Sequence, residues 1–204
     1  MTADTIDLAQ PFIPEDRQRA EMSRLVGDGL LRRVTGRVLV RSDVPDTLAL
    51  RARAVQLALA GPGPRSSDEV IDRGVVGFRT AQWVHAGGDC GPEDCGIDLV
   101  IAPGTHRPRL RGAVVHEHRL GPRDVDTMCG VRLTTPVRTA ADLVRTLPGD
   151  QALVALDRLR ITCGVRAIDV VEQFDRMPRC RGVARGRRLV HAWATSWASA
   201  ALGG

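Results

Sequence analysis

Apolar residues in the first part of the chain are spaced as in a helix and then as in a hairpin. Met22 and Val26 share one face of a predicted helix over 17–26. Two short apolar runs follow, on either side of Thr35-Gly36, where glycine supplies the positive φ that a tight turn requires. We therefore predict a helix followed by a β-hairpin.

The rest of the chain mixes helical and strand patterns. Helical spacing predicts helices over 48–60 and 80–86, and from Pro136 onward it predicts a bundle of helices. The apolar stretches expected to form strands are 97–102, 113–118 and 131–134. This combination of elements predicts the α+β class.

The N-terminal helix and hairpin, "RLVGDGLLRRVTGRVLV", have the order of a winged helix-turn-helix, in which the last helix enters the DNA major groove. Only 16 residues precede the predicted helix, whereas a complete winged helix has two helices there. We therefore predict a truncated winged-helix domain over 1–46, or one completed by the helix at 48–60. A mixed α+β domain over 47–204, ending in a helical bundle, is expected to follow.

Positive charge is concentrated in this front part. All 29 basic residues are arginines, and with 24 acidic residues the net charge is +5. Seven arginines and two acidic residues lie between Arg17 and Arg41, so this segment carries the whole net charge. Arginine suits phosphates and guanine edges, and the predicted DNA contacts are Arg17, Arg19 and Arg24 on the helix and Arg32, Arg33 and Arg37 on the wing. The alternative is a solvated basic helix packed on a hairpin.

Several classes of protein are disfavoured by composition. Aromatic residues make up 3% of the chain and tyrosine is absent, which argues against a single-strand binder that stacks bases. The five cysteines are odd in number and scattered, as in a cytoplasmic protein with reduced thiols. Cys90 and Cys95 near His85 lack the spacing of a zinc site. No apolar run approaches the length of a membrane helix, so we expect a cytoplasmic protein that does not contact membranes.

Two clusters of polar residues are candidates for chemistry or binding. His116 and His118 lie on one face of a predicted strand, but no third metal ligand has suitable spacing. A run of arginines over 176–188 could grip phosphates or an acidic partner, and a solvated face is the alternative. No catalytic motif is present, so we expect neither enzymatic activity nor a cofactor.

The segment "TTPVRTAADL" carries the strongest local signal of the second half. Thr135 is a suitable N-cap and Pro136 suits the first helical position. Arg138 and Asp142 are spaced to pair across one helical turn, a contact expected to add little stability. We interpret the segment as the start of a helix.

Four segments together resemble the AbiEi-like antitoxins of type IV toxin–antitoxin systems and the bacterial transcriptional regulators related to them. The similarity covers residues 20–195. The segments that carry it are "GLLRRVTGRVLV", "VGFRTAQWVHAGG", "DLVIAPGTHRPRLRGAVVHEHRL" and "GVRLTTPVRTAADLV".

The resemblance implies a winged-helix DNA-binding domain, repression of the protein's own operon by binding its promoter region, and a functional pairing with a nucleotidyltransferase-like toxin. It assigns the DNA role to Arg24, Arg32, Arg33 and Arg37. The family signature falls on Thr134, Thr135, Pro136, Arg138, Thr139 and Asp142. Many related chains continue into a Vsr-like endonuclease domain that is not in this sequence, so nuclease activity is not expected.

Two other functions remain open from the residues. One is a protein-interaction module whose DNA-binding domain has decayed and whose C-terminal helices and arginines bind a protein partner. The other is a metal-dependent enzyme that uses His116 and His118. The sequence specifies neither an operator nor an oligomeric state.

Overall fold

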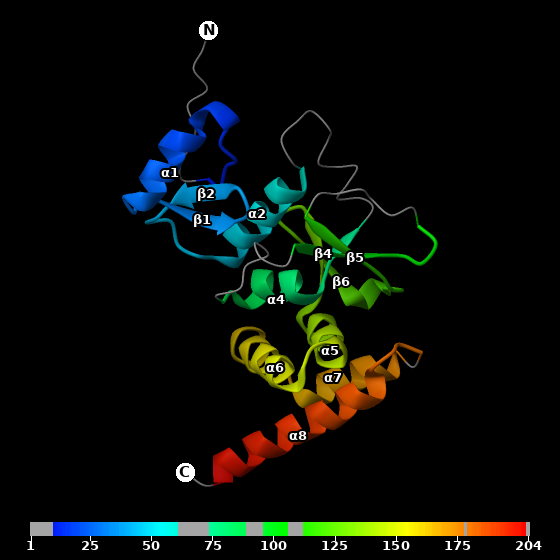
Figure 1. The fold of residues 1–204 in the computed structure, drawn as a ribbon. Helices are drawn as coiled ribbons and strands as arrows, with labels where there is room; N and C mark the ends of the chain where they lie inside the picture. Colours follow the sequence, from blue (N-terminus) through cyan, green and yellow to red (C-terminus); the bar gives the residue numbers. More distant parts are fainter. Residues whose placement is uncertain (1–9, 61–73, 89–95, 106–111, 178, 203–204) are drawn as a thin grey trace.

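The computed structural model describes residues 10–60, 74–88, 96–105, 112–177 and 179–202. Within these ranges the chain forms helices and two sheets, which confirms the α+β class. A helix-and-hairpin unit lies at one end, a sheet with a covering helix in the middle, and a helical bundle at the other end (Figure 1). None of the described helices is both long and apolar enough to cross a lipid bilayer.

The N-terminal unit has the predicted order of a helix and a hairpin. Its elements are the 3-10 turn η1 (Asp16–Gln18), helix α1 (Arg19–Gly27) and the antiparallel strands β1 (Leu31–Thr35) and β2 (Val38–Arg41). Gly36 has a φ of +50° in the turn, as the sequence predicts for a tight hairpin. Phe12 forms an antiparallel bridge to Leu39, so the segment before α1 also lies against the hairpin.

Helix α2 (Leu48–Ala60) has the predicted bounds and packs on the hairpin. Val38 and Val40 of β2 belong to the same buried cluster as Val55 of α2 and Leu133 in the larger sheet. Hydrophobic contacts therefore cross the boundary expected between residues 46 and 47, which stays a prediction.

The larger sheet has the strand order β5-β4-β3-β7-β6. Its strands are β3 (Val75–Val76), β4 (Ile97–Ile101), β5 (Ala113–Glu117), β6 (Val125–Met128) and β7 (Val131–Thr134). The pairs β4–β5 and β3–β7 are parallel, and β3–β4 and β6–β7 are antiparallel. The sequence did not predict β6, because this edge strand is short, only half-buried and contains Asp126 and Thr127.

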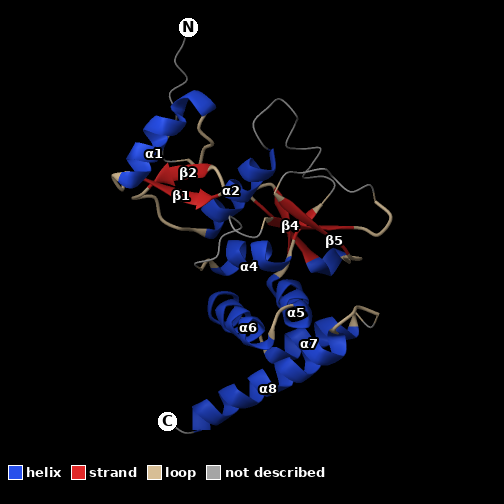
Figure 2. Cartoon of the chain, in the orientation of Figure 1, coloured by secondary structure: helices blue, strands red, loops and turns tan. Residues whose placement is uncertain are grey.

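Helix α4 (Phe78–Ala86) lies between the sheet and the bundle (Figure 2). The bundle consists of α5 (Pro136–Thr146), α6 (Gly149–Cys163), α7 (Ala167–Asp175) and α8 (Val183–Leu202). Leu143, Leu156, Phe174 and Val190 meet in its apolar core. The predicted succession of helices after Pro136 is confirmed.

Candidate functional site

A basic groove lies between α1 and the hairpin. Met22 of α1 packs on Leu31 and Leu39, which fixes the helix against one face of the two strands. Beside this apolar contact a groove of about 270 Å³ is lined by Arg19, Arg33 and Arg37 among others. The fold thus brings together three arginines from α1, β1 and the turn.

One carboxylate holds two of these arginines. Asp16 Oδ1 accepts hydrogen bonds from Arg19 Nη2 at 2.6 Å and from Arg37 Nη2 at 2.7 Å. The positive charge of Arg19, followed by the hydrogen bond from Arg37, holds the pKa of Asp16 below its ordinary value. Arg33 donates instead to the carbonyl oxygen of Gly36. Two cations therefore share a single anion, and the groove keeps a net positive charge.

The other three predicted DNA contacts lie outside this groove. Arg17 pairs with Glu15 at 2.6 Å, and both side chains are exposed. Arg24 is exposed on α1, and its guanidinium has no partner in the part of the chain that the structure describes. Arg32 precedes Arg33 on β1 and therefore faces the opposite side of the hairpin, where its Nη2 donates to the Val44 oxygen at 2.9 Å.

The signature segment forms the predicted start of a helix. Thr135 is the N-cap of α5, its hydroxyl accepting from the Arg138 backbone NH at 3.3 Å, and Pro136 occupies the first helical position. The hydroxyls of Thr134 and Thr139, both buried, are 2.7 Å apart. All six signature residues thus lie at the junction of β7 and α5.

The predicted pair of Arg138 and Asp142 is confirmed, with Nε donating to Oδ2 at 2.9 Å. The side chains are only 1% and 0% exposed, so the pair is buried, which its spacing in the sequence does not indicate. Arg138 Nη1 also donates to Asp124 at 2.9 Å, and Arg145 donates to the other oxygen of Asp142 at 2.9 Å. Two arginines and two aspartates therefore form a buried cluster with balanced charge.

This cluster extends toward the sheet and α7 through neutral groups. Gln173 of α7 donates to Asp124 Oδ1 at 2.9 Å. Arg145 Nη2 lies 2.8 Å from His118 Nε2, and because a guanidinium can only donate, that nitrogen is an acceptor in a neutral ring. Burial, and then the positive charge of Arg145, lower the pKa of His118.

The two histidines predicted to share a face do contact one residue in common. The rings of His116 and His118 lie 4.0 and 5.9 Å from the ring of Phe78. His116 Nε2 also lies 2.7 Å from Asp98 Oδ1. Phe78 begins α4 with a φ of +48°, a left-handed conformation that is strained for a bulky residue. The described contacts of this pair join the sheet to the bundle.

His85, which precedes Cys90 and Cys95 along the chain, is buried in α4. Its Nε2 donates to the Thr134 carbonyl oxygen at 2.8 Å, and burial lowers its pKa. Cys90 and Cys95 lie outside the described residues. Within those residues, no three His, Cys, Asp or Glu side chains gather where a metal ion could bind.

The second arginine run is divided among different environments. Arg185 lies against the bundle and donates to the carbonyl oxygens of Val144 and Leu147 near the end of α5. Arg187 pairs with Asp175 at 2.5 Å. Arg188 is exposed on α8, and Arg176 and Arg179 border a cavity on another side. The run is therefore no continuous face.

The buried cluster could be recognised only in part from the sequence. The spacing of Arg138 and Asp142 indicates their pairing, whereas Asp124 and Gln173 lie far from them along the chain. No protein family model and no curated protein matches the chain.

Proposed function

We propose that the chain binds duplex DNA through the groove between α1 and the β1–β2 hairpin. The observation that carries the proposal is the convergence of Arg19, Arg33 and Arg37 in one groove. A helix beside a basic hairpin is also the arrangement with which winged-helix proteins meet DNA.

The groove has the electrostatics of a phosphate site. Asp16 shares its charge between Arg19 and Arg37, and all three side chains are exposed to solvent. Exposed ion pairs contribute little to stability, so a phosphate can replace Asp16 at little cost. Arg24 adds an exposed cation on the same helix.

For the cellular role, we propose an antitoxin-like regulator that represses its own operon and counters a nucleotidyltransferase-like toxin. This part rests on the resemblance of the four sequence segments to AbiEi-like antitoxins. The proposed activity needs no catalysis, because a repressor acts by occupying its promoter.

Fluorescence anisotropy with a duplex from the region upstream of the gene tests DNA binding, at about 50 and about 200 mM salt. Each lost phosphate contact is expected to reduce the slope of log K against log salt by about 0.9. Arg33→Gln and Arg37→Gln should each show this loss. Arg32→Gln is the matched control, because it removes the neighbouring charge from the opposite face of the same strand.

Two results would overturn the proposal. One is binding that is absent or insensitive to salt. The other is an equal loss in Arg32→Gln and Arg33→Gln, which would show that only net charge matters. A scrambled duplex of equal length tests the regulatory role separately, since a repressor prefers its own promoter.

A further inference from the structure

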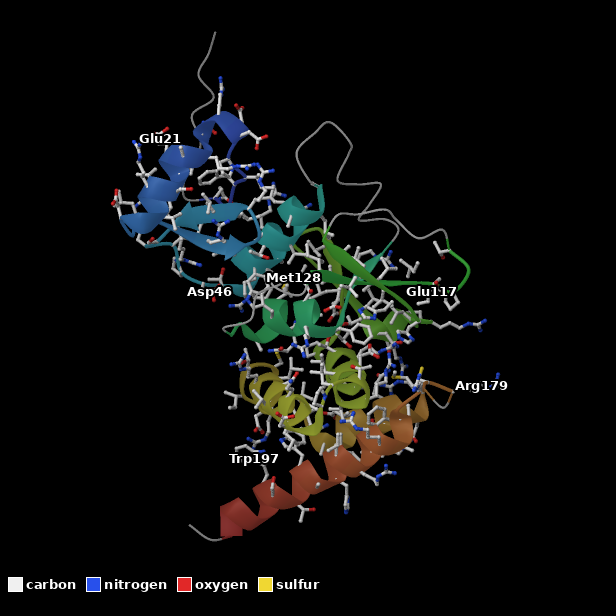
Figure 3. The ribbon with its side chains drawn as sticks, viewed as in Figure 1. Glu21, Asp46, Glu117, Met128, Arg179 and Trp197 are labelled. Atoms are coloured by element: carbon white, nitrogen blue, oxygen red, sulfur yellow. The ribbon has the colours of Figure 1, made fainter. Side chains whose placement is uncertain are left out.

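A second cavity, of about 730 Å³, lies beside the buried cluster and away from α1. One wall is the end of β5 and the segment that follows it, and the other is the connection between α7 and α8. Figure 3 shows Glu117 and Arg179, which come from these two walls, on the same side of the molecule. The volume falls within the range of about 300–1,000 Å³ that is usual for small-molecule sites.

Positive charge dominates the lining. Five arginines line the cavity together with two carboxylates, Glu117 and Asp124; the arginines are Arg119, Arg123, Arg138, Arg176 and Arg179. Both oxygens of Asp124 are occupied, by Arg138, Gln173 and the Gly121 backbone NH. Asp124 therefore has both oxygens engaged by protein donors.

Three of the arginines have no side-chain partner among the described residues. Arg119, Arg123 and Arg179 are exposed, and no carboxylate within the described ranges lies within ion-pair distance of their guanidinium groups. They come from both walls, so an anion between them would contact two separate segments.

A buried donor provides an independent indication of a ligand. Arg138 lines the cavity and is 1% exposed, and its Nε and Nη1 are hydrogen-bonded. Its Nη2 is also buried, yet no polar atom of the described residues lies within hydrogen-bond distance. A buried N–H on a permanent cation is costly when unpartnered, and an anionic oxygen satisfies it best.

Apart from His118, whose Nε2 accepts from Arg145, the remaining lining is largely apolar. Met177 is buried, and Leu120, Pro103 and Pro122 complete this part of the cavity. A polar anion would leave that surface in contact with water, whereas an organic group would cover it. The cavity therefore combines a cationic part with an apolar part, as in sites for small charged organic molecules.

We propose that this cavity binds a small organic phosphate, with the phosphate between Arg123 and Arg179 and toward Arg138, and the organic group on Met177 and Leu120. The forked guanidinium groups match the phosphate oxygens. The site is distinct from the groove beside α1, so it can exist whether or not that groove binds DNA.

Isothermal titration of the full chain with phenyl phosphate tests the proposal, because this probe combines one phosphate with one apolar ring. Arg123→Gln and Arg179→Gln should each weaken binding by about tenfold, the effect of one lost charged hydrogen bond. Arg188→Gln removes an exposed arginine elsewhere on the bundle and should leave binding unchanged. Inorganic phosphate and phenol should each bind more weakly than phenyl phosphate, because each lacks one half of the probe.

The variants should melt at the temperature of the unchanged protein, since Arg123 and Arg179 are exposed. Absence of phenyl phosphate binding, or an equal loss in Arg188→Gln, would overturn the proposal. A third result would also overturn it: duplex DNA competes with phenyl phosphate, and Arg123→Gln binds DNA more weakly. That combination would show that the cavity binds nucleic acid. We expect Arg33→Gln to bind phenyl phosphate as the unchanged protein does. This result distinguishes the cavity proposal from the proposal that the groove beside α1 binds DNA.

Discussion

Arg138 and Asp142 lie one turn apart on α5 and pair through Nε and Oδ2 at 2.9 Å, with both side chains removed from solvent. The pair connects Asp124, before β6, with Arg145, farther along α5. Because the cluster holds equal numbers of cations and anions, removing any one member leaves an uncompensated buried charge.

Asp142→Asn is expected to lower the free energy of unfolding by about 3–5 kcal/mol, because it leaves two buried guanidinium groups facing one carboxylate. Urea unfolding measures this loss. Asp169→Asn is the matched control, since Asp169 pairs with the largely exposed Arg166 and should cost at most about 1 kcal/mol. Equal losses of unfolding free energy in the two variants would show that burial does not increase the contribution of the Asp142 ion pairs.

Acid should destabilise the fold through His85, which is buried, and His118, which is partly buried. The pKa values of His85 and His118 lie below the ordinary 6.5 in the folded chain. Above that value both rings are neutral in the folded and unfolded chains and contribute no pH dependence. Below it the unfolded chain takes up protons first, so the free energy of unfolding falls until the folded pKa is reached.

Urea midpoints at about pH 7.5 and about pH 5.5 measure this effect, whose limit is about 1.4 kcal/mol per pH unit for each histidine. His85→Gln keeps a donor for the Thr134 oxygen but cannot titrate. The free energy of unfolding of this variant should therefore change less with pH. If the free energy of unfolding of His85→Gln changes with pH as much as that of the unchanged protein, His85 is not a source of the pH dependence.

Gly186→Ala is expected to separate α8 from α7. A Cβ at this position would lie 2.6 Å from Cζ of Phe174, which is itself fully buried. Overpacking of this kind costs about 1–3 kcal/mol, which thermal unfolding would detect. Gly149→Ala, where the nearest atom would be at 3.7 Å, should cause no loss.

The N-cap of α5 gives a smaller, local prediction. Thr135→Ala removes the hydroxyl that accepts from the Arg138 NH and should cost about 1 kcal/mol. Thr135→Ser keeps that oxygen and should retain most of the stability. If both variants lose the same amount, the cap contributes little in this chain.

Elements with local signals could be predicted from the sequence. Gly36 marks the hairpin turn, helical spacing gives the bounds of α2, and Thr135-Pro136 marks the start of α5. The edge strand β6 was missed because half-exposed polar residues give it no apolar pattern. Such a strand is recognised only when its partner β7 is already in place.

The candidate sites depended on contacts between distant segments. The contact of Gln173 with Asp124 joins positions with no periodic relation, so no spacing rule could find it. Arg32 and Arg33 were predicted as one set, although alternation along a strand places neighbours on opposite faces. The structure places them on opposite faces of the hairpin, and of these two residues only Arg33 lines the groove.

The left-handed backbone of Phe78 has a further consequence. A glycine there would remove a strain of about 1–3 kcal/mol. It would also remove the ring that lies against His116, His118 and the Arg145 guanidinium, 5.5 Å from the ring centre. The first residue of α4 therefore holds one aromatic ring against two histidines and an arginine, and the less favourable backbone conformation accompanies that placement.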